Sequence, residues 1–138
     1  MRVLVPMDGS EQSWQAFEYA AERFPDATLV VLRVINPVQA GYGIGLNGAA
    51  GAGQWLDAQE EATENLFEEV HKDAEAAGVD VETRKEIGRP ARTITDVAEE
   101  CDQVVIGSHG REGVSRILLG SVAENVVRRS TVPVTVVR

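Results

Sequence analysis

The chain has 138 residues, of which 22 are acidic and 13 basic, so its formal charge at neutral pH is −9. This length suffices for a sizeable core, and we expect a single domain over residues 1–138. The acidic, lysine-poor composition disfavours nucleic acids and anionic membranes as partners, because both attract basic proteins. Such a composition would suit a salt-rich cytoplasm, and it is equally typical of an ordinary acidic bacterial or archaeal protein.

No segment has the pattern of a membrane span or of a secretion signal. No apolar run approaches the ~20 residues that cross a bilayer. The first residues, MRVLVPMDGS, lack the apolar length and the small-residue cleavage site of a signal peptide. The single cysteine, Cys101, excludes an internal disulfide framework and is interpreted as structural. Together these features predict a cytoplasmic protein.

The first half of the chain alternates the patterns of strands and helices. RVLVP (2–6) is a short apolar run, which predicts a strand covered on both faces. A helix follows, with Ser10 as its expected N-cap. Its apolar residues recur at helical spacing: Trp14, Phe17, Ala20, Ala21 and Phe24. ATLVVLRVI (27–35) is the second predicted strand.

A Gly-rich stretch and then a long helix come next. Gly78 is expected to close this helix, because a glycine after the last turn readily adopts a left-handed conformation. Apolar residues at steps of three or four predict one buried stripe along the helix. The expected stripe consists of Trp55, Ala58, Ala62, Leu66, Val70, Ala74 and Ala77. His71 falls on the polar side and is expected to be solvated.

Two helices and three strands are predicted in the second half. VDVETRKEI (79–87) alternates apolar and polar residues, as a strand near a sheet edge does. Pro90 suits the first turn of a helix. The apolar face of that helix is Ile94, Val97 and Ala98. QVVIG (103–107) is a buried strand, a helix starts near Ser121, and VPVTVVR (132–138) is the last strand.

This alternation predicts an α/β fold with a five-stranded parallel sheet and helices on both faces. The third and fifth strands are the more alternating ones, and Pro133 in the fifth also suits an edge. The strand order 3-2-1-4-5 places both at the edges. In that order the winding reverses between strands 1 and 4, and open α/β sheets bind ligands beyond the carboxyl ends of their strands at such a reversal.

Two glycine-rich stretches compete for the ligand site. Residues 41–53 contain Gly43-x-Gly45-x-x-Gly48, the spacing of dinucleotide-binding loops. A true fingerprint leaves a strand and opens a helix at once, whereas this stretch follows the second strand after a gap, away from the reversal. We therefore interpret it as a mobile loop or lid. The stretch 107–121 follows the fourth strand and lies at the reversal.

The second stretch has the chemistry of an anion site. Gly107 and Gly110 allow close approach of a ligand to the backbone, so their amides could point at phosphate oxygens. Gly120 and Ser121 open the last helix, whose free N–H groups and dipole attract anions. The alternative is a capping box, in which Ser121 and Glu124 cap the helix with no ligand at all.

At these residues the chain resembles a known family. Gly107-x2-Gly110-x9-Gly120-Ser121 matches the ATP-binding motif of the universal stress protein family. The segment IGSHGREGVSRILLGSVAENVVRRSTVPVTVV resembles that family almost residue for residue, and RVLVPMDGSEQS and GRPARTI resemble its earlier segments. The resemblance covers the chain except residues 38–54. It implies the same 3-2-1-4-5 sheet, in the adenine nucleotide alpha hydrolase-like group of Rossmann-like folds.

The resemblance also implies a ligand, which is ATP or the related ADP or AMP. Asp8, beside Pro6, would contact the ribose or adenine, and Val34 would line the adenine pocket. Other residues would surround the ribose and phosphates. The implied binding residues are Pro6, Asp8, Val34, Gly107, His109, Gly110, Gly120, Ser121 and Val122. The charge of ATP beside an acidic protein favours Mg²⁺ as its companion ion.

Several of the polar residues allow a second interpretation. Asp8 could be a turn residue in MDGS that precedes the helix. His109 could brace its loop rather than catalyse, since the sequence pairs no serine or carboxylate clearly with it. Arg111 and Arg116 could offset phosphate charge or be ordinary surface residues.

The predicted function is that of a cytoplasmic, ATP-binding, dimeric stress-response or signalling module with an unknown protein partner. The short apolar C-terminal strand would pair with its symmetry mate, and the resemblance implies the same interface. One alternative is a slow ATPase or autophosphorylating enzyme. No catalytic residues are assigned, because the sequence offers no acid–base pair, metal-ligand cluster or activated nucleophile. The other alternative is an interaction module without nucleotide.

Overall fold

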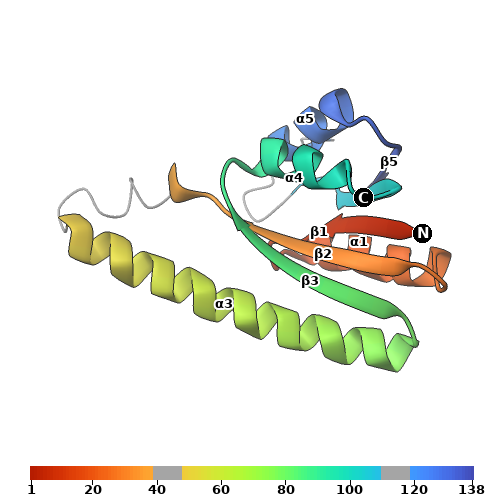
Figure 1. Ribbon diagram of the computed structural model, residues 1–138, viewed down its shortest axis with the longest axis horizontal. Coiled ribbons are helices and arrows are strands. Elements are labelled where there is room, and N and C mark those ends of the chain that lie inside the picture. The colour runs from red at the N-terminus through yellow and green to blue at the C-terminus, as the bar shows by residue number, and fades with distance from the viewer. Residues whose placement is uncertain (39–47, 110–118) are drawn as a thin grey trace.

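The computed structural model describes residues 1–38, 48–109 and 119–138 of the chain. Within this part, five parallel strands form one sheet in the order β3-β2-β1-β4-β5 (Figure 1). The strands are β1 (Arg2–Pro6), β2 (Thr28–Ile35), β3 (Asp80–Ile87), β4 (Gln103–Gly107) and β5 (Val134–Val137). The α/β class, the strand order and the edge positions of the third and fifth strands are thus confirmed.

In the described part of the chain, two helices cover each face of the sheet. The helices α1 (Glu11–Arg23) and α3 (Gly48–Ala77) pack on one face. The helices α4 (Pro90–Ala98) and α5 (Ser121–Arg129) pack on the other, as Figure 1 shows. Among the described residues, none of these helices combines the length and the apolar character needed to cross a membrane.

The predicted helix ends are confirmed at three positions. The Ser13 N–H donates to Ser10 Oγ over 3.2 Å, so Ser10 caps α1. Gly78 has a φ of +72°, the left-handed conformation expected after the last turn of α3. Pro90 occupies the first turn of α4, where its missing N–H costs nothing.

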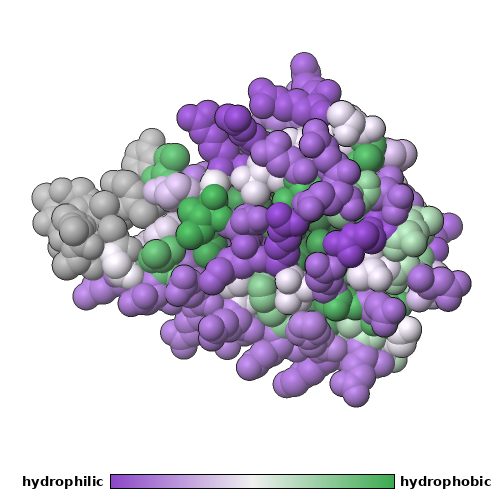
Figure 2. Space-filling view, in the orientation of Figure 1, coloured by the Kyte–Doolittle hydropathy of each residue, from purple (hydrophilic) through white to green (hydrophobic). Residues whose placement is uncertain are grey.

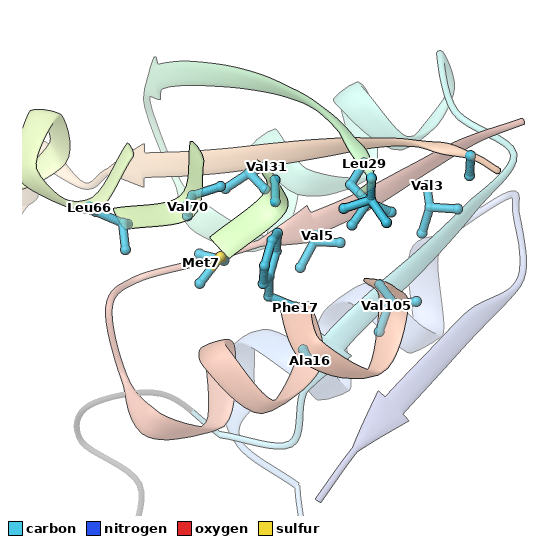
Figure 3. Close-up of a cluster of buried hydrophobic side chains, with 14 residues drawn as sticks. Val3, Val5, Met7, Ala16, Phe17, Leu29, Val31, Leu66, Val70 and Val105 are labelled. Carbon is cyan, nitrogen blue, oxygen red and sulfur yellow. The ribbon is translucent and has the colours of Figure 1, made fainter. Parts of the chain in front are cut away.

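A first hydrophobic core fills the space between the sheet and the helices α1 and α3 (Figure 3). Phe17 of α1 is 1% exposed, and its ring meets Trp14 edge-on with the ring centroids 5.8 Å apart. Met7 extends this core to the end of β1, where it is 3% exposed. Burial of each large apolar side chain stabilises the fold by about 1.5–3 kcal/mol, so this packing fixes α1 and the end of β1 together.

A second core lies under α4 and α5. Strand residues alternate between the two cores, since Val3 and Val5 face the first and Leu4 faces the second. Ile94, Val97 and Ala98 of α4 are buried as predicted. Cys101 is also buried, and desolvation raises the pKa of its thiol, which keeps the thiol protonated and inert.

The long helix differs from its prediction in its start and in its buried face. It begins at Gly48, so residues 48–53 are helical and not part of a loop, while residues 41–47 lie outside the described residues. Among the side chains of α3 that the structure describes, the buried ones are Thr63, Leu66, Val70 and Ala74. Ala58, Ala62 and Ala77 are exposed. Gln59 contacts Arg33 of β2 and Thr63 is 1% exposed, so in this part of α3 the face toward the sheet lies one residue after the predicted positions Ala58 and Ala62.

The two edge strands present different surfaces. Side chains of β3 make ion pairs, such as Arg84 with Glu100 at 2.8 Å and Lys85 with Glu60 at 3.6 Å. Hydrophilic side chains also cover most of the face shown in Figure 2. The β5 edge, in contrast, has the apolar sequence VTVV with half-buried side chains. Charged edge strands resist pairing with another sheet, so β5 is the edge that favours it.

The helical position of Gly53 and the left-handed backbone of Gly78 predict opposite stability changes on substitution by alanine. A Cβ at Gly53 would meet nothing within 4 Å. Gly53→Ala should therefore stabilise the protein by about 1 kcal/mol through helix propensity. Gly78→Ala should destabilise it by ~1 kcal/mol, because alanine is strained in the left-handed conformation. Urea unfolding measures both changes, and a destabilising Gly53→Ala would contradict the helix at this position.

Candidate functional site

The reversal of the sheet lies between the carboxyl ends of β1 and β4. The strands β1 and β4 pair in parallel, with Leu4 opposite Val104. The chain therefore leaves both strands at the same edge of the sheet. Residues 7–10 follow β1 and Ser108 follows β4, so the two predicted loops start side by side.

The turn after β1 is built from Asp8, Gly9 and Ser10. Asp8 Oδ1 accepts a hydrogen bond from the Ser10 N–H over 2.9 Å. Gly9 has a φ of +83°, which side-chain-bearing residues rarely adopt. Asp8 is thus the turn residue that one interpretation expected, and its carboxylate is held half-buried at the end of β1. This role leaves the predicted contact with a ligand untested.

Gly107 at the end of β4 is required by the packing of α1. A Cβ built on Gly107 would lie 2.8 Å from the carbonyl oxygen of Gln12 and 2.9 Å from its carbonyl carbon. These are main-chain atoms of the first turn of α1, so they cannot move aside as a side chain would. This glycine has a structural cause independent of any ligand.

Gly120 holds the start of α5 against the end of β4. Its N–H donates to the carbonyl oxygen of Ser108 over 2.6 Å. A Cβ on Gly120 would lie 3.1 Å from both Cα and Cβ of His109 and 3.2 Å from the Ser108 oxygen. We call this contact the Gly120 clamp. It brings together residues on either side of positions 110–118, which are outside the described residues, as are Gly110, Arg111 and Arg116.

The capping-box interpretation of α5 is wrong. Gly120 is the N-cap and makes no side-chain cap, while Ser121 is already the first helical residue. The carboxylate of Glu124 pairs with Arg128 at 2.9 Å instead of turning back to the helix start. The box fails because the helix starts at Ser121, one position earlier than a box with Ser121 as the N-cap requires. Among the described residues, the first turn of α5 therefore lacks the side-chain cap that would compete with an anion.

A serine–histidine pair, not found from the sequence, lies beside the Gly120 clamp. Ser108 Oγ is 3.0 Å from His109 Nδ1, and Ser108 is only 3% exposed. The direction of this hydrogen bond depends on the tautomer of the ring. In the neutral tautomer that accepts from the Ser108 hydroxyl at Nδ1, the ring proton is on Nε2, where it can be donated to a ligand. The signal that could have found this pair is the S-H sequence directly after a buried strand.

The end of β2 contributes backbone N–H and C=O groups to the candidate site. The Leu32 carbonyl accepts from the Met7 N–H over 2.8 Å, and the Ile35 carbonyl accepts from the Gly88 N–H over 2.9 Å. Along a strand, the backbone N–H and C=O groups of successive residues point alternately to the two neighbouring strands. The groups of Leu32 point toward β1 and those of Ile35 toward β3, so the N–H and C=O of Val34 point toward β1. Because β1 ends at Pro6, the Val34 groups face the space beyond β1.

The structure thus gathers most of the predicted residues at one edge of the sheet. Pro6 is buried at the end of β1, and Val34 is 8% exposed near the end of β2. Ser121 and Val122 lie exposed in the first turn of α5. Within the described ranges, no group of three or more His, Cys, Asp or Glu side chains could hold a metal ion.

Comparisons with known proteins agree with this geometry. Residues 1–138 match the model of the universal stress protein family. The universal stress protein MJ0531 of Methanocaldococcus jannaschii is 37% identical over 145 residues, which cover 99% of this chain and 81% of that protein.

Solved structures give the same result. The structure of MJ0577, from the same organism, superposes with a TM-score of 0.88 at 28% identity, over 99% of this chain and 94% of that one. A universal stress protein in complex with cAMP superposes with a TM-score of 0.67 at 28% identity, over 100% and 96% of the two chains. This chain belongs to the universal stress protein family.

Proposed function

We propose that this protein binds an adenine nucleotide, with ATP as the favoured ligand, where β1, β2 and β4 end beside α5. The observation that carries the proposal is the Gly120 clamp, which holds the first turn of α5 at the reversal of the sheet. The similar universal stress protein in complex with cAMP supports an adenine nucleotide as the ligand class.

The phosphates would lie at the first turn of α5. Backbone N–H groups there point out of the helix, and the helix dipole adds partial positive charge. The Ser121 hydroxyl and the Nε2 proton of His109 would add two side-chain donors. The protein is strongly acidic, so the nucleotide would bind together with Mg²⁺ on its phosphates, which reduces the repulsion between ligand and protein.

The nucleoside would lie across the ends of β1 and β2. The half-buried Asp8 carboxylate would accept hydrogen bonds from ribose hydroxyls. The Val34 N–H and C=O form a donor and an acceptor side by side, which complement N1 and the 6-amino group of adenine. Pro6 and the Val34 side chain would supply apolar contact with the base, as the sequence resemblance implies.

Nucleotide binding would control a homodimer in a cytoplasmic stress-response pathway that includes a further protein partner. The dimer would form through β5. The Val104 N–H donates to the Pro133 carbonyl and the Ser108 N–H to the Val137 carbonyl, so odd-numbered residues of β5 face β4. The backbone groups of Val134 and Val136 therefore face the open edge.

The first prediction concerns the phosphate site. Calorimetric titration of protein refolded from denaturant, and so freed of bound ligand, should show that ATP binds. Gly120→Ala should weaken ATP binding at least about tenfold, because the added methyl group forces His109 away from α5. Gly53→Ala is the matched control and should leave the affinity unchanged. Failure of the wild type to bind, or equal affinity of the Gly120 variant, would refute the site.

A second prediction concerns the serine–histidine pair. In wild-type protein, at a pH where the ring is neutral, the ¹⁵N chemical shifts of His109 should report the tautomer protonated at Nε2. Ser108→Ala should mix the two neutral tautomers and weaken ATP binding roughly fivefold, since one hydrogen bond is worth about 1 kcal/mol. Ser130→Ala, at the far end of α5, should change neither. An unaltered tautomer in Ser108→Ala would show that Ser108 does not position the ring.

A third prediction concerns the dimer. Val136→Pro removes one outward N–H from β5 and leaves the ladder to β4 intact, since position 136 does not donate to β4. Sedimentation velocity should show a dimer for the wild type and a larger monomer fraction for Val136→Pro. Val136→Thr keeps the N–H and should stay dimeric. An unchanged dimer in Val136→Pro would exclude the β5 edge as the interface.

A further inference from the structure

Arg33 connects the long helix α3 with the base-reading edge of β2. Its Nη1 donates to the Val34 carbonyl oxygen over 2.7 Å, and its Nη2 donates to Gln59 Oε1 over 2.9 Å. The guanidinium is planar and its donors have a fixed arrangement, so the hydrogen bonds made by Nη1 and Nη2 together define its orientation. Arg33 thus places a cationic donor at the carbonyl that would read the base.

This placement changes which chemical group suits position 6 of a purine. The 6-amino group of adenine is a donor, so it must share the Val34 carbonyl with the Arg33 guanidinium. A 6-oxo purine, such as hypoxanthine, presents an acceptor at the same position and could accept from Nη1. Charge-assisted hydrogen bonds are roughly twice as strong as neutral ones, so the guanidinium is a strong competitor.

We propose that Arg33 is a specificity-determining residue that lowers the preference of the site for 6-amino over 6-oxo purine nucleotides. The inference rests on the proposed nucleotide site and concerns its selectivity. Gln59 supports the effect from α3 by holding the second arm of the guanidinium beside Val34. The selectivity of the site is thereby coupled to the position of α3.

The test compares ATP with inosine triphosphate, whose bases differ at position 6 and at the proton on N1. N1 would face the same Val34 N–H in every variant. The contribution of N1 to the ratio of the two dissociation constants is therefore the same in all variants and cancels when they are compared. Arg33→Met keeps the aliphatic stem of the side chain and removes its donors. The ratio of the two dissociation constants should shift about tenfold toward ATP, as expected for the loss of one hydrogen bond to a charged group.

Two further variants make the test specific. Gln59→Met leaves Arg33 in place but removes its acceptor on α3, so the ratio should shift in the same direction by a smaller factor. Arg84→Met is the matched control, because its guanidinium pairs with Glu86 and Glu100 on the opposite side of β2 from β1. This control should leave the ratio unchanged. If Arg33→Met does not fold, Gln59→Met decides the question.

The outcomes separate this inference from the proposed function. ATP binding by the wild type, with an unchanged or reversed ratio in folded Arg33→Met and Gln59→Met, overturns the role of Arg33 and leaves the nucleotide site standing. A wild type that binds neither nucleotide overturns the proposed function and this inference with it. A shift toward ATP in both variants, absent from Arg84→Met, supports the assignment.

Discussion

The site depends on one short contact, the Gly120 clamp. The Gly120 N–H donates to the Ser108 carbonyl, and the space between Gly120 and His109 admits no Cβ without displacement. This contact fixes the start of α5 beside the end of β4, although eleven residues lie between Ser108 and Gly120 in the sequence. Gly107 performs the matching task on the other side, where β4 touches the backbone of α1. Both glycines are explained by packing, and the packing then positions the helix terminus.

The negative net charge of the protein explains why backbone N–H groups would be needed to attract phosphate. A protein with a net charge of −9 would repel a nucleotide at long range. Oriented backbone N–H groups attract phosphate at short range without adding net charge, so the α5 terminus can act where the overall field is unfavourable. Arg33 adds one cation at the opposite, base end of the proposed site. Selectivity and affinity would thus arise from different elements, β2 with α3 for the base and α5 for the phosphates.

Much of the fold follows from the sequence, and the details of the site do not. The strand order could be predicted by comparing the strands, because central strands buried on both faces are continuously apolar and edge strands alternate between apolar and polar residues. The start of α3 was missed because glycine and alanine carry little periodic signal. The capping box failed through a shift of one residue. The contacts of Ser108 with His109 and of Arg33 with Val34 depend on side-chain conformations that no spacing specifies. The ligand roles of the site residues stay predictions.

Amide chemical-shift mapping tests the central claim most directly. Ligand-free protein labelled with ¹⁵N would be titrated with ATP and, separately, with adenosine, which shares the base and ribose but lacks phosphates. We expect both ligands to shift the amide signals near Val34, and only ATP to shift those of Ser121 and Val122 strongly. If ATP instead shifts signals at the start of α3, around residues 48–53, and leaves Ser121 and Val122 unchanged, the α5 terminus is not the phosphate site.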